Sequence, residues 1–93
     1  MIKHVVCHRY REKAEAYKIS AMLNALVGVV PSLRSMETGV DIQDSPRSFH
    51  LVLISTFDDR DGLDAYQNHP EHVKVKDYIH TVLENAVSVD YEY

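Results

Sequence analysis

Residues 48–57 read SFHLVLISTF and give the strongest strand pattern in the chain. Neighbouring side chains of an extended strand point to opposite sides, so the pattern divides into two faces. One face carries His50, Val52 and Ile54, and the other carries Leu51, Leu53 and Phe57. A strand that is apolar on both faces has to be covered on both faces.

The sequence around this strand predicts three further strands and a long helix. Residues 86–93 alternate between apolar and polar side chains, and residues 2–9 form an alternating pattern with apolar side chains on both faces, so we expect strands there. Residues 33–42 are a weaker strand candidate, interrupted by Gly39. Between residues 2–9 and 33–42, apolar residues recur at three- and four-residue spacing over residues 11–30, the pattern of an amphipathic helix. We expect that helix to end near Gly28, because the following proline cannot continue it.

Two shorter helices are predicted after residues 48–57. Asp58 and Asp59 have the side chains that cap a helix, and this helix runs through Tyr66. Pro70 suits the first turn of the next helix. The order strand, helix, strand, strand, helices, strand predicts one α+β domain, residues 1–93, with a ferredoxin-like βαββαβ arrangement and a four-stranded antiparallel sheet.

Self-association is predicted from the two-sided strand. In a chain of 93 residues the helices can cover only one face of the sheet. We expect Leu51, Leu53 and Phe57 to lie on the uncovered face, where a second copy would close a dimeric α+β barrel. Cys7 is the sole cysteine, so no disulfide can stabilise so small a domain.

The composition excludes several classes of partner. A net charge of −4 without a basic cluster argues against nucleic acid and against an anionic membrane surface. No apolar run approaches the roughly 20 residues that span a bilayer. The start of the chain lacks a signal-peptide pattern and the single cysteine suits a reducing compartment, so we expect a cytoplasmic protein.

Histidine and tyrosine are the side chains that point to chemistry. His72 begins the apolar stripe of the last helix, so its ring should face the sheet, either as a proton carrier or as a hydrogen-bonded core residue. Tyr66 could meet it across the break at Pro70, as a hydrogen-bond donor to a developing oxyanion or as a packing residue. His4 and His50 lie among apolar strand residues and could flank the same pocket, or bond to polar neighbours.

The sequence gives little support for a metal site or a cofactor. His69 and His72 have the spacing of two ligands, but no third ligand is identifiable and Pro70 constrains His69, which better suits a loop-to-helix junction. Cys7 is more typical of a small buried hydrophobe than of a nucleophile. The chain has no glycine-rich phosphate loop, nucleophile elbow or dinucleotide fingerprint, so we predict no metal and no cofactor.

The stretch Tyr66-Gln67-Asn68-His69-Pro70-Glu71-His72-Val73 resembles the signature of the stress-responsive dimeric A/B barrel (Dabb) family. Other stretches resemble the same family in the same order: Ile2-Lys3-His4-Val5-Val6, Pro31, His50-Leu51-Val52-Leu53 before Thr56-Phe57, and Val89-Asp90-Tyr91. The resemblance covers essentially the whole chain. It implies a ferredoxin-like subunit in a homodimer, with an apolar pocket between sheet and helices.

Plant polyketide cyclases similar to that family use a tyrosine and a histidine as an acid–base pair, with further histidines in the first and third strands. Carried over by position, the resemblance implies Tyr66 and His72 as the catalytic pair and His4 and His50 as substrate contacts. His8 shares the face of His4 and would make the pocket more polar than a polyketide site.

Three hypotheses follow. The first is a homodimer that binds a small apolar or aromatic ligand between sheet and helices. The second is a cofactor-free acid–base enzyme acting on a carbonyl compound, such as a cyclase, a lyase or a monooxygenase-like protein. The third is a purely structural dimer. For the first two, the expected site comprises Tyr66 and His72 with His4, His50, Val6, His8 and Val52.

Overall fold

The computed structural model describes residues 1–93 as one α+β unit. Its elements are β1 (Ile2–Tyr10), α1 (Glu15–Asn24), β2 (Ser35–Val40), β3 (Leu51–Phe57), α2 (Arg60–Asn68), α3 (Pro70–Val82) and β4 (Leu83–Glu92). The strands form one sheet in the order β2-β3-β1-β4, and every neighbouring pair is antiparallel. This confirms the predicted ferredoxin-like α+β fold with its four-stranded sheet.

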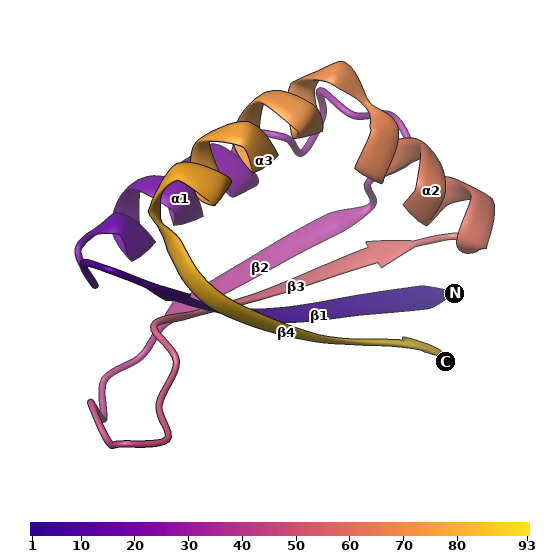
Figure 1. The fold of residues 1–93 in the computed structure, drawn as a ribbon. Coiled ribbons are helices and arrows are strands. Elements are labelled where there is room, and N and C mark those ends of the chain that lie inside the picture. The colour runs from indigo at the N-terminus through magenta and orange to yellow at the C-terminus, as the bar shows by residue number, and fades with distance from the viewer.

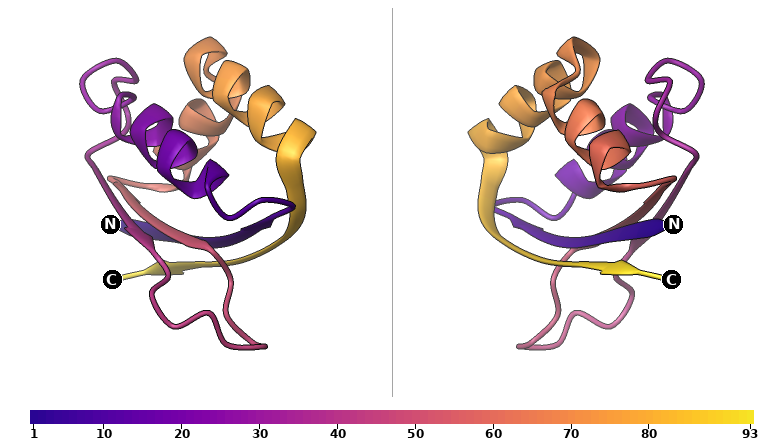
Figure 2. Two further views of the ribbon diagram at one scale, coloured as in Figure 1. Left: turned by 90° about the vertical axis from the view of Figure 1, so that its left-hand side faces the viewer. Right: turned by 90° about the vertical axis from the view of Figure 1, so that its right-hand side faces the viewer.

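All three helices lie on the same face of the curved sheet (Figure 1, Figure 2). The core fills the space between them. Its most buried large side chains are Tyr10, Tyr66, Phe57, Ile19, Leu23, Leu51 and Val30. None of the three helices has the length and apolarity that crossing a bilayer requires.

The expectation that Leu51, Leu53 and Phe57 lie on the uncovered face is wrong. All three are at most 5% exposed and belong to the core beneath the helices. Alternation divides a two-sided strand into two sets of residues, but it does not say which set meets the helices. The register decides this, since Phe57 pairs with the buried Ile2.

The face that the helices leave uncovered, called here the open face, is nevertheless apolar. It carries Val5 and Cys7 of β1, Val52 and Ile54 of β3, and Val87, Val89 and Tyr91 of β4. Val87, Val89 and Tyr91 are 52%, 64% and 44% exposed. The helices therefore leave one apolar face of the sheet exposed to solvent, as predicted, but its residues differ from the predicted ones.

The first helix is shorter than predicted. α1 ends at Asn24, and turns continue to Ser32 through Gly28, whose φ of 84° suits a residue without a Cβ. Leu26 and Val30 remain buried in these turns, so their helix-like spacing reflects the core and not a continuous helix.

The connection between β2 and β3, residues 41–50, projects from the sheet on the side away from the helices (Figure 1). Ile42 in this connection is 95% exposed. The connection is held to the sheet at its base, where Arg9 donates a hydrogen bond of 2.8 Å to the carbonyl of Ser48. The open face and the projecting connection thus lie on the same side of the molecule.

Candidate functional site

A cavity of about 190 Å³ lies between the sheet and the helices, against α3 and the edge strand β4. Six elements contribute to its wall: His4, Val6 and His8 of β1, Leu23 of α1, Leu53 of β3, Tyr66 of α2, His72, Lys76, Ile79 and His80 of α3, and Leu83 and Ala86 of β4. Its wall is thus an apolar surface interrupted by histidines, one tyrosine and one lysine.

The structure brings five of the seven predicted site residues to this cavity. Tyr66, His72, His4, Val6 and His8 all line it. Neighbouring even-numbered residues of β1 share the face that the helices cover, so the three β1 side chains point to the same space.

His50 and Val52 do not line this cavity. His4 pairs with Ser55, so odd-numbered residues of β3 share the helix side and Val52 falls on the open face. The ring of His50 instead accepts a hydrogen bond of 3.0 Å from the main-chain N–H of Tyr10. The structure therefore separates His50 and Val52 from the other predicted residues.

Three polar residues near the cavity were not predicted. Lys76 and His80 line it, and they follow His72 at four-residue spacing on α3, a signal that the sequence already contained. Asp90 hydrogen-bonds to the cavity residue His4 from β4. That contact depends on the pairing of the first strand with the last, which no local sequence pattern reveals.

The corner between α2 and α3 sets the positions of Tyr66 and His72. α2 begins at the predicted cap, where Asp59 accepts a hydrogen bond of 2.8 Å from the N–H of Gly62. α3 begins with Pro70, and the ring of His69 accepts from the N–H of Glu71 at 3.1 Å. His69 is thus a helix cap, as its predicted place at the junction implied.

Tyr66 is 1% exposed, and its hydroxyl oxygen is buried without a hydrogen-bond partner in the protein. Its ring packs between Phe57, at 5.1 Å between centroids, and His72, at 4.3 Å. Burial raises the pKa of the Tyr66 hydroxyl above its usual value of 10.0, so the group is protonated at neutral pH. It is available as a hydrogen-bond donor and unsuited to act as a base.

His72 presents a free ring nitrogen. Its Nδ1 lies 3.1 Å from the carbonyl oxygen of Gln67, which can only accept, so Nδ1 donates. In the neutral ring Nε2 is then an unprotonated acceptor. Burial lowers the pKa of His72 below 6.5, with smaller contributions in the same direction from Lys76, His4 and His69 and an opposing one from Gln67. At neutral pH His72 is therefore a base.

His4 and Asp90 form a second oriented imidazole. The Nδ1 of His4 hydrogen-bonds to the Asp90 carboxylate across the β1–β4 pair, and the two residues are direct cross-strand partners. The His4 side chain is 12% exposed and that of Asp90 44%. The carboxylate fixes the tautomer of His4 and leaves its Nε2 as the free nitrogen.

His8 lines the cavity from β1, four residues after His4 on the same side of the strand. Its Nδ1 is 2.9 Å from the hydroxyl of Tyr10. Burial, followed by the nearby His4 and His80, lowers the pKa of His8 to about 4. It is neutral at physiological pH and contributes a polar but uncharged wall.

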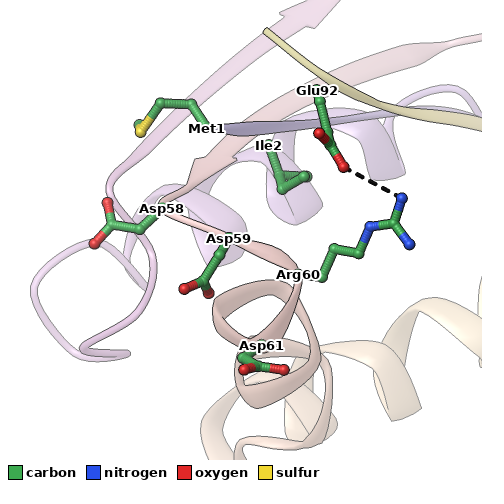
Figure 3. A pocket seen from close by; sticks show the side chains of 7 residues that line it. All are labelled: Met1, Ile2, Asp58, Asp59, Arg60, Asp61 and Glu92. Atoms are coloured by element: carbon green, nitrogen blue, oxygen red, sulfur yellow. Dashed lines mark hydrogen bonds and ion pairs between the residues drawn. The ribbon is translucent and has the colours of Figure 1, made fainter.

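A larger hollow of about 330 Å³ lies near the ends of β1 and β4 and is acidic (Figure 3). Most of its charges are already engaged, since Asp59 caps α2 and Arg60 pairs with Glu92 at 3.2 Å. Asp58 pairs outside the hollow with Arg34 at 2.7 Å. No group of three or more histidine, cysteine or acidic residues in the chain is placed to hold a metal ion.

Comparison with known proteins gives a consistent picture. The family model described as Stress responsive A/B Barrel Domain matches residues 2–93. A stress-response A/B barrel domain-containing protein of Arabidopsis thaliana is 28% identical over 95 residues, which cover 98% of this chain but only 36% of that protein. The chain therefore spans about a third of that relative's length. A second protein of the same description from this plant is 27% identical over 92 residues, covering 96% of this chain and 83% of its own.

Two solved structures show the same fold. A protein of unknown function from Bacteroides fragilis, described as dimeric and ferredoxin-like, is 26% identical with a TM-score of 0.82, covering 99% of this chain and 95% of its own. A hydroxynitrile lyase from Passiflora edulis is 20% identical with a TM-score of 0.82, covering 97% of this chain and 90% of its own. At 20% identity this second likeness concerns the fold alone.

Proposed function

The chain belongs to the stress-responsive A/B barrel domain family, and on that premise we propose that it is a homodimer that binds a small ligand in the cavity between sheet and α3. The ligand has an apolar body and a polar group that accepts a hydrogen bond from Tyr66 and approaches Nε2 of His72. We place the protein in the cytoplasm, since its one cysteine forms no disulfide.

The open face supports the homodimer. Its apolar side chains come from three strands, and those of β4 are exposed while those of β1 and β3 are half-buried. Contiguous apolar patches of this kind mark interaction surfaces. Residues 41–50 project on the same side, where they would flank a second copy (Figure 1). The Bacteroides fragilis protein with the same fold is described as dimeric.

The unpartnered hydroxyl of Tyr66 is the observation that carries the ligand proposal. A buried hydroxyl without a partner costs about 1–3 kcal/mol, a cost that a ligand oxygen would remove. Clefts that hold drug-sized ligands measure roughly 300–1,000 Å³. The cavity, at about 190 Å³, therefore suits a smaller molecule, for example a single ring with one polar group.

NMR titration with benzamide, and separately with benzoate, tests the site. We expect saturable shifts of the methyl signals of Leu53 and Ile79, which line the cavity. Tyr66→Phe should weaken binding by about three- to tenfold, because one hydrogen bond is lost. Tyr17→Phe is the matched control, since Tyr17 is 66% exposed on α1. The proposal fails if neither probe gives saturable shifts, or if the shifts map outside the cavity.

Acid–base catalysis is the second candidate, and it is favoured by the free Nε2 of His72, whose ring packs on the ring of Tyr66. His72 would take a proton from the carbon next to a carbonyl, while Tyr66 would donate a hydrogen bond to the oxyanion that forms. The protein from Passiflora edulis with this fold is described as a lyase. No cofactor is required for this chemistry.

Exchange of the methyl protons of acetophenone in D2O tests this second candidate. We expect the wild type to accelerate exchange and His72→Gln to abolish the acceleration. Lys74→Gln should keep it, because Lys74 lies on the same helix but outside the cavity. Equal exchange with and without protein contradicts the enzyme hypothesis. If Tyr66→Phe and His72→Gln change neither binding nor exchange, the purely structural dimer remains.

A further inference from the structure

The titratable side chains that line the cavity are basic or phenolic, and none is acidic. They are four histidines, one tyrosine and one lysine: His4, His8, His72, His80, Tyr66 and Lys76. No carboxylate lines the cavity, although the chain has 14 acidic residues against 10 lysines and arginines and a net charge of −4. In an acidic protein, this concentration of basic groups around one space has to be explained.

The basic groups form a path from solvent into the cavity. His72, Lys76 and His80 follow each other at four-residue spacing, which places them along one side of α3. Lys76 and His80 are exposed, whereas His72 is half-buried. Lys76 is therefore the permanent positive charge at the mouth, and His72 is the first imidazole inside.

Two acids on the elements around the cavity are hydrogen-bonded to other side chains. Asp90 of β4 is bonded to His4 of β1. Glu15 of α1 accepts a hydrogen bond of 2.5 Å from the hydroxyl of Tyr78 on α3. Lys76 lines the cavity and no carboxylate does, so the potential along its wall favours an anion.

The other polar groups around His72 and His8 are neutral or basic. Tyr66 of α2 packs on His72 as an uncharged phenol. Tyr10 is bonded to His8, and its main-chain N–H is bonded to His50 before β3. His69, at the α2–α3 corner, acts on His72 in the same direction as Lys76, lowering its pKa.

From this distribution we infer that the ligand is a small carboxylate with an apolar body, drawn in by Lys76, and that its binding is accompanied by proton uptake at His72. The apolar body would occupy the part of the cavity lined by Leu53, Ile79 and Leu83. This inference rests on the proposed ligand-binding function and specifies its ligand class.

Proton uptake follows from the chemistry of the ring. In the empty cavity burial lowers the pKa of His72, so Nε2 is unprotonated at neutral pH. A carboxylate beside Nε2 favours the imidazolium and raises the pKa in the complex. The complex then binds more protons than the free protein, so affinity rises as the pH falls through the raised pKa of the complex toward the lowered pKa of the free protein.

Titration calorimetry with benzoate and its neutral isostere benzamide tests the inference. Benzoate should bind about tenfold or more tightly than benzamide, and its affinity should rise at least about threefold between roughly pH 8 and pH 6, where its carboxylate stays ionised. The binding enthalpy should depend on the ionisation enthalpy of the buffer, which reports proton uptake.

Lys76→Gln supplies the variant arm of the test. It should weaken benzoate binding by about three- to tenfold and benzamide binding by less, because benzamide carries no charge. Lys74→Gln is the control, since Lys74 lies on the same helix, pairs with Glu71 at 3.0 Å and does not line the cavity. His72→Gln should remove the buffer dependence.

Two results separate this inference from the proposed function. Benzamide binding in the cavity as tightly as benzoate, or unaltered benzoate affinity in Lys76→Gln, overturns the carboxylate assignment and leaves the ligand site standing. Failure of both probes to bind overturns both. Benzoate binding without buffer-dependent enthalpy overturns proton uptake at His72.

Discussion

Two tyrosines in the core illustrate how differently one residue type can be used. Tyr10 and Tyr66 are each 1% exposed. The hydroxyl of Tyr10 is 2.9 Å from Nδ1 of His8, whereas the hydroxyl of Tyr66 has no partner. A hydroxyl that serves only the fold is normally hydrogen-bonded when buried. The contrast supports the proposal that the Tyr66 hydroxyl serves a ligand.

Removal of each hydroxyl should therefore have opposite effects on stability. We expect Tyr66→Phe to leave the free energy of unfolding unchanged or to raise it by up to about 1 kcal/mol, because an unsatisfied group disappears. Tyr10→Phe should lower it by about 1–2 kcal/mol, because a buried hydrogen bond to His8 is lost. Urea denaturation at a fixed protein concentration measures both, and a destabilised Tyr66→Phe would indicate a structural role.

His8 makes the stability depend on pH. Its pKa is about 4 in the folded protein against 6.5 for an unperturbed imidazole, so the unfolded chain binds more protons between these values. Stability should thus fall as the pH drops from about 6.5 to about 4, with His8 contributing up to about 3 kcal/mol.

Urea denaturation across this pH range provides the measurement. The acid limb is the fall in the free energy of unfolding as the pH drops from about 6.5 to about 4. His8→Gln removes the ionisable ring and should make this limb less steep. His80→Gln, on the exposed side of α3, is the comparison and should change the limb less. An acid limb of the same slope in His8→Gln and the wild type would contradict this assignment.

Among the elements, the α2–α3 corner was the most predictable part of the site. Asp59, His69 and Pro70 act within a few residues of their own positions, as helix caps and as a first-turn proline. The convergence of Tyr66 and His72 depends on the same short segment, which is why the sequence could pair them. The end of α1 was less predictable, because the turns that follow it keep a helix-like spacing of buried apolar residues.

Loss of the α2 cap should destabilise the protein without damaging the cavity directly. Asp59→Ala removes the acceptor for the N–H of Gly62 and should lower the free energy of unfolding by about 1 kcal/mol. Asp61→Ala, in the first turn of the same helix but not its cap, is the control. Thermal or urea denaturation compares the two, and equal stability would show that the cap contributes nothing.

At the scale of the whole molecule, the sequence predicted an exposed apolar face but assigned the wrong residues to it. β3 is apolar on both faces, so its alternation is symmetric, and only its pairing with β1 and β2 distinguishes the helix side from the open side. For the same reason, the prediction that His50 and Val52 share a pocket with His4 was wrong. Local patterns do not encode the register between strands that are far apart in the sequence. The contact of Asp90 with His4 depends on such a register and could not be predicted.

A charge on the open face should separate the subunits. Val89 is 64% exposed, and it pairs with Val5 on this face. Val89→Asp would bury an unpaired carboxylate in a dimer and should abolish self-association. Val27→Asp is the control, since Val27 is 45% exposed in the turns after α1. Light scattering after gel filtration would show two different masses.

Sedimentation equilibrium of the wild type tests most directly the claim that a second copy covers the open face. The account predicts about twice the 10.7 kDa of one chain at micromolar concentration. A single species of 10.7 kDa that stays folded and dispersed under the same conditions would contradict it.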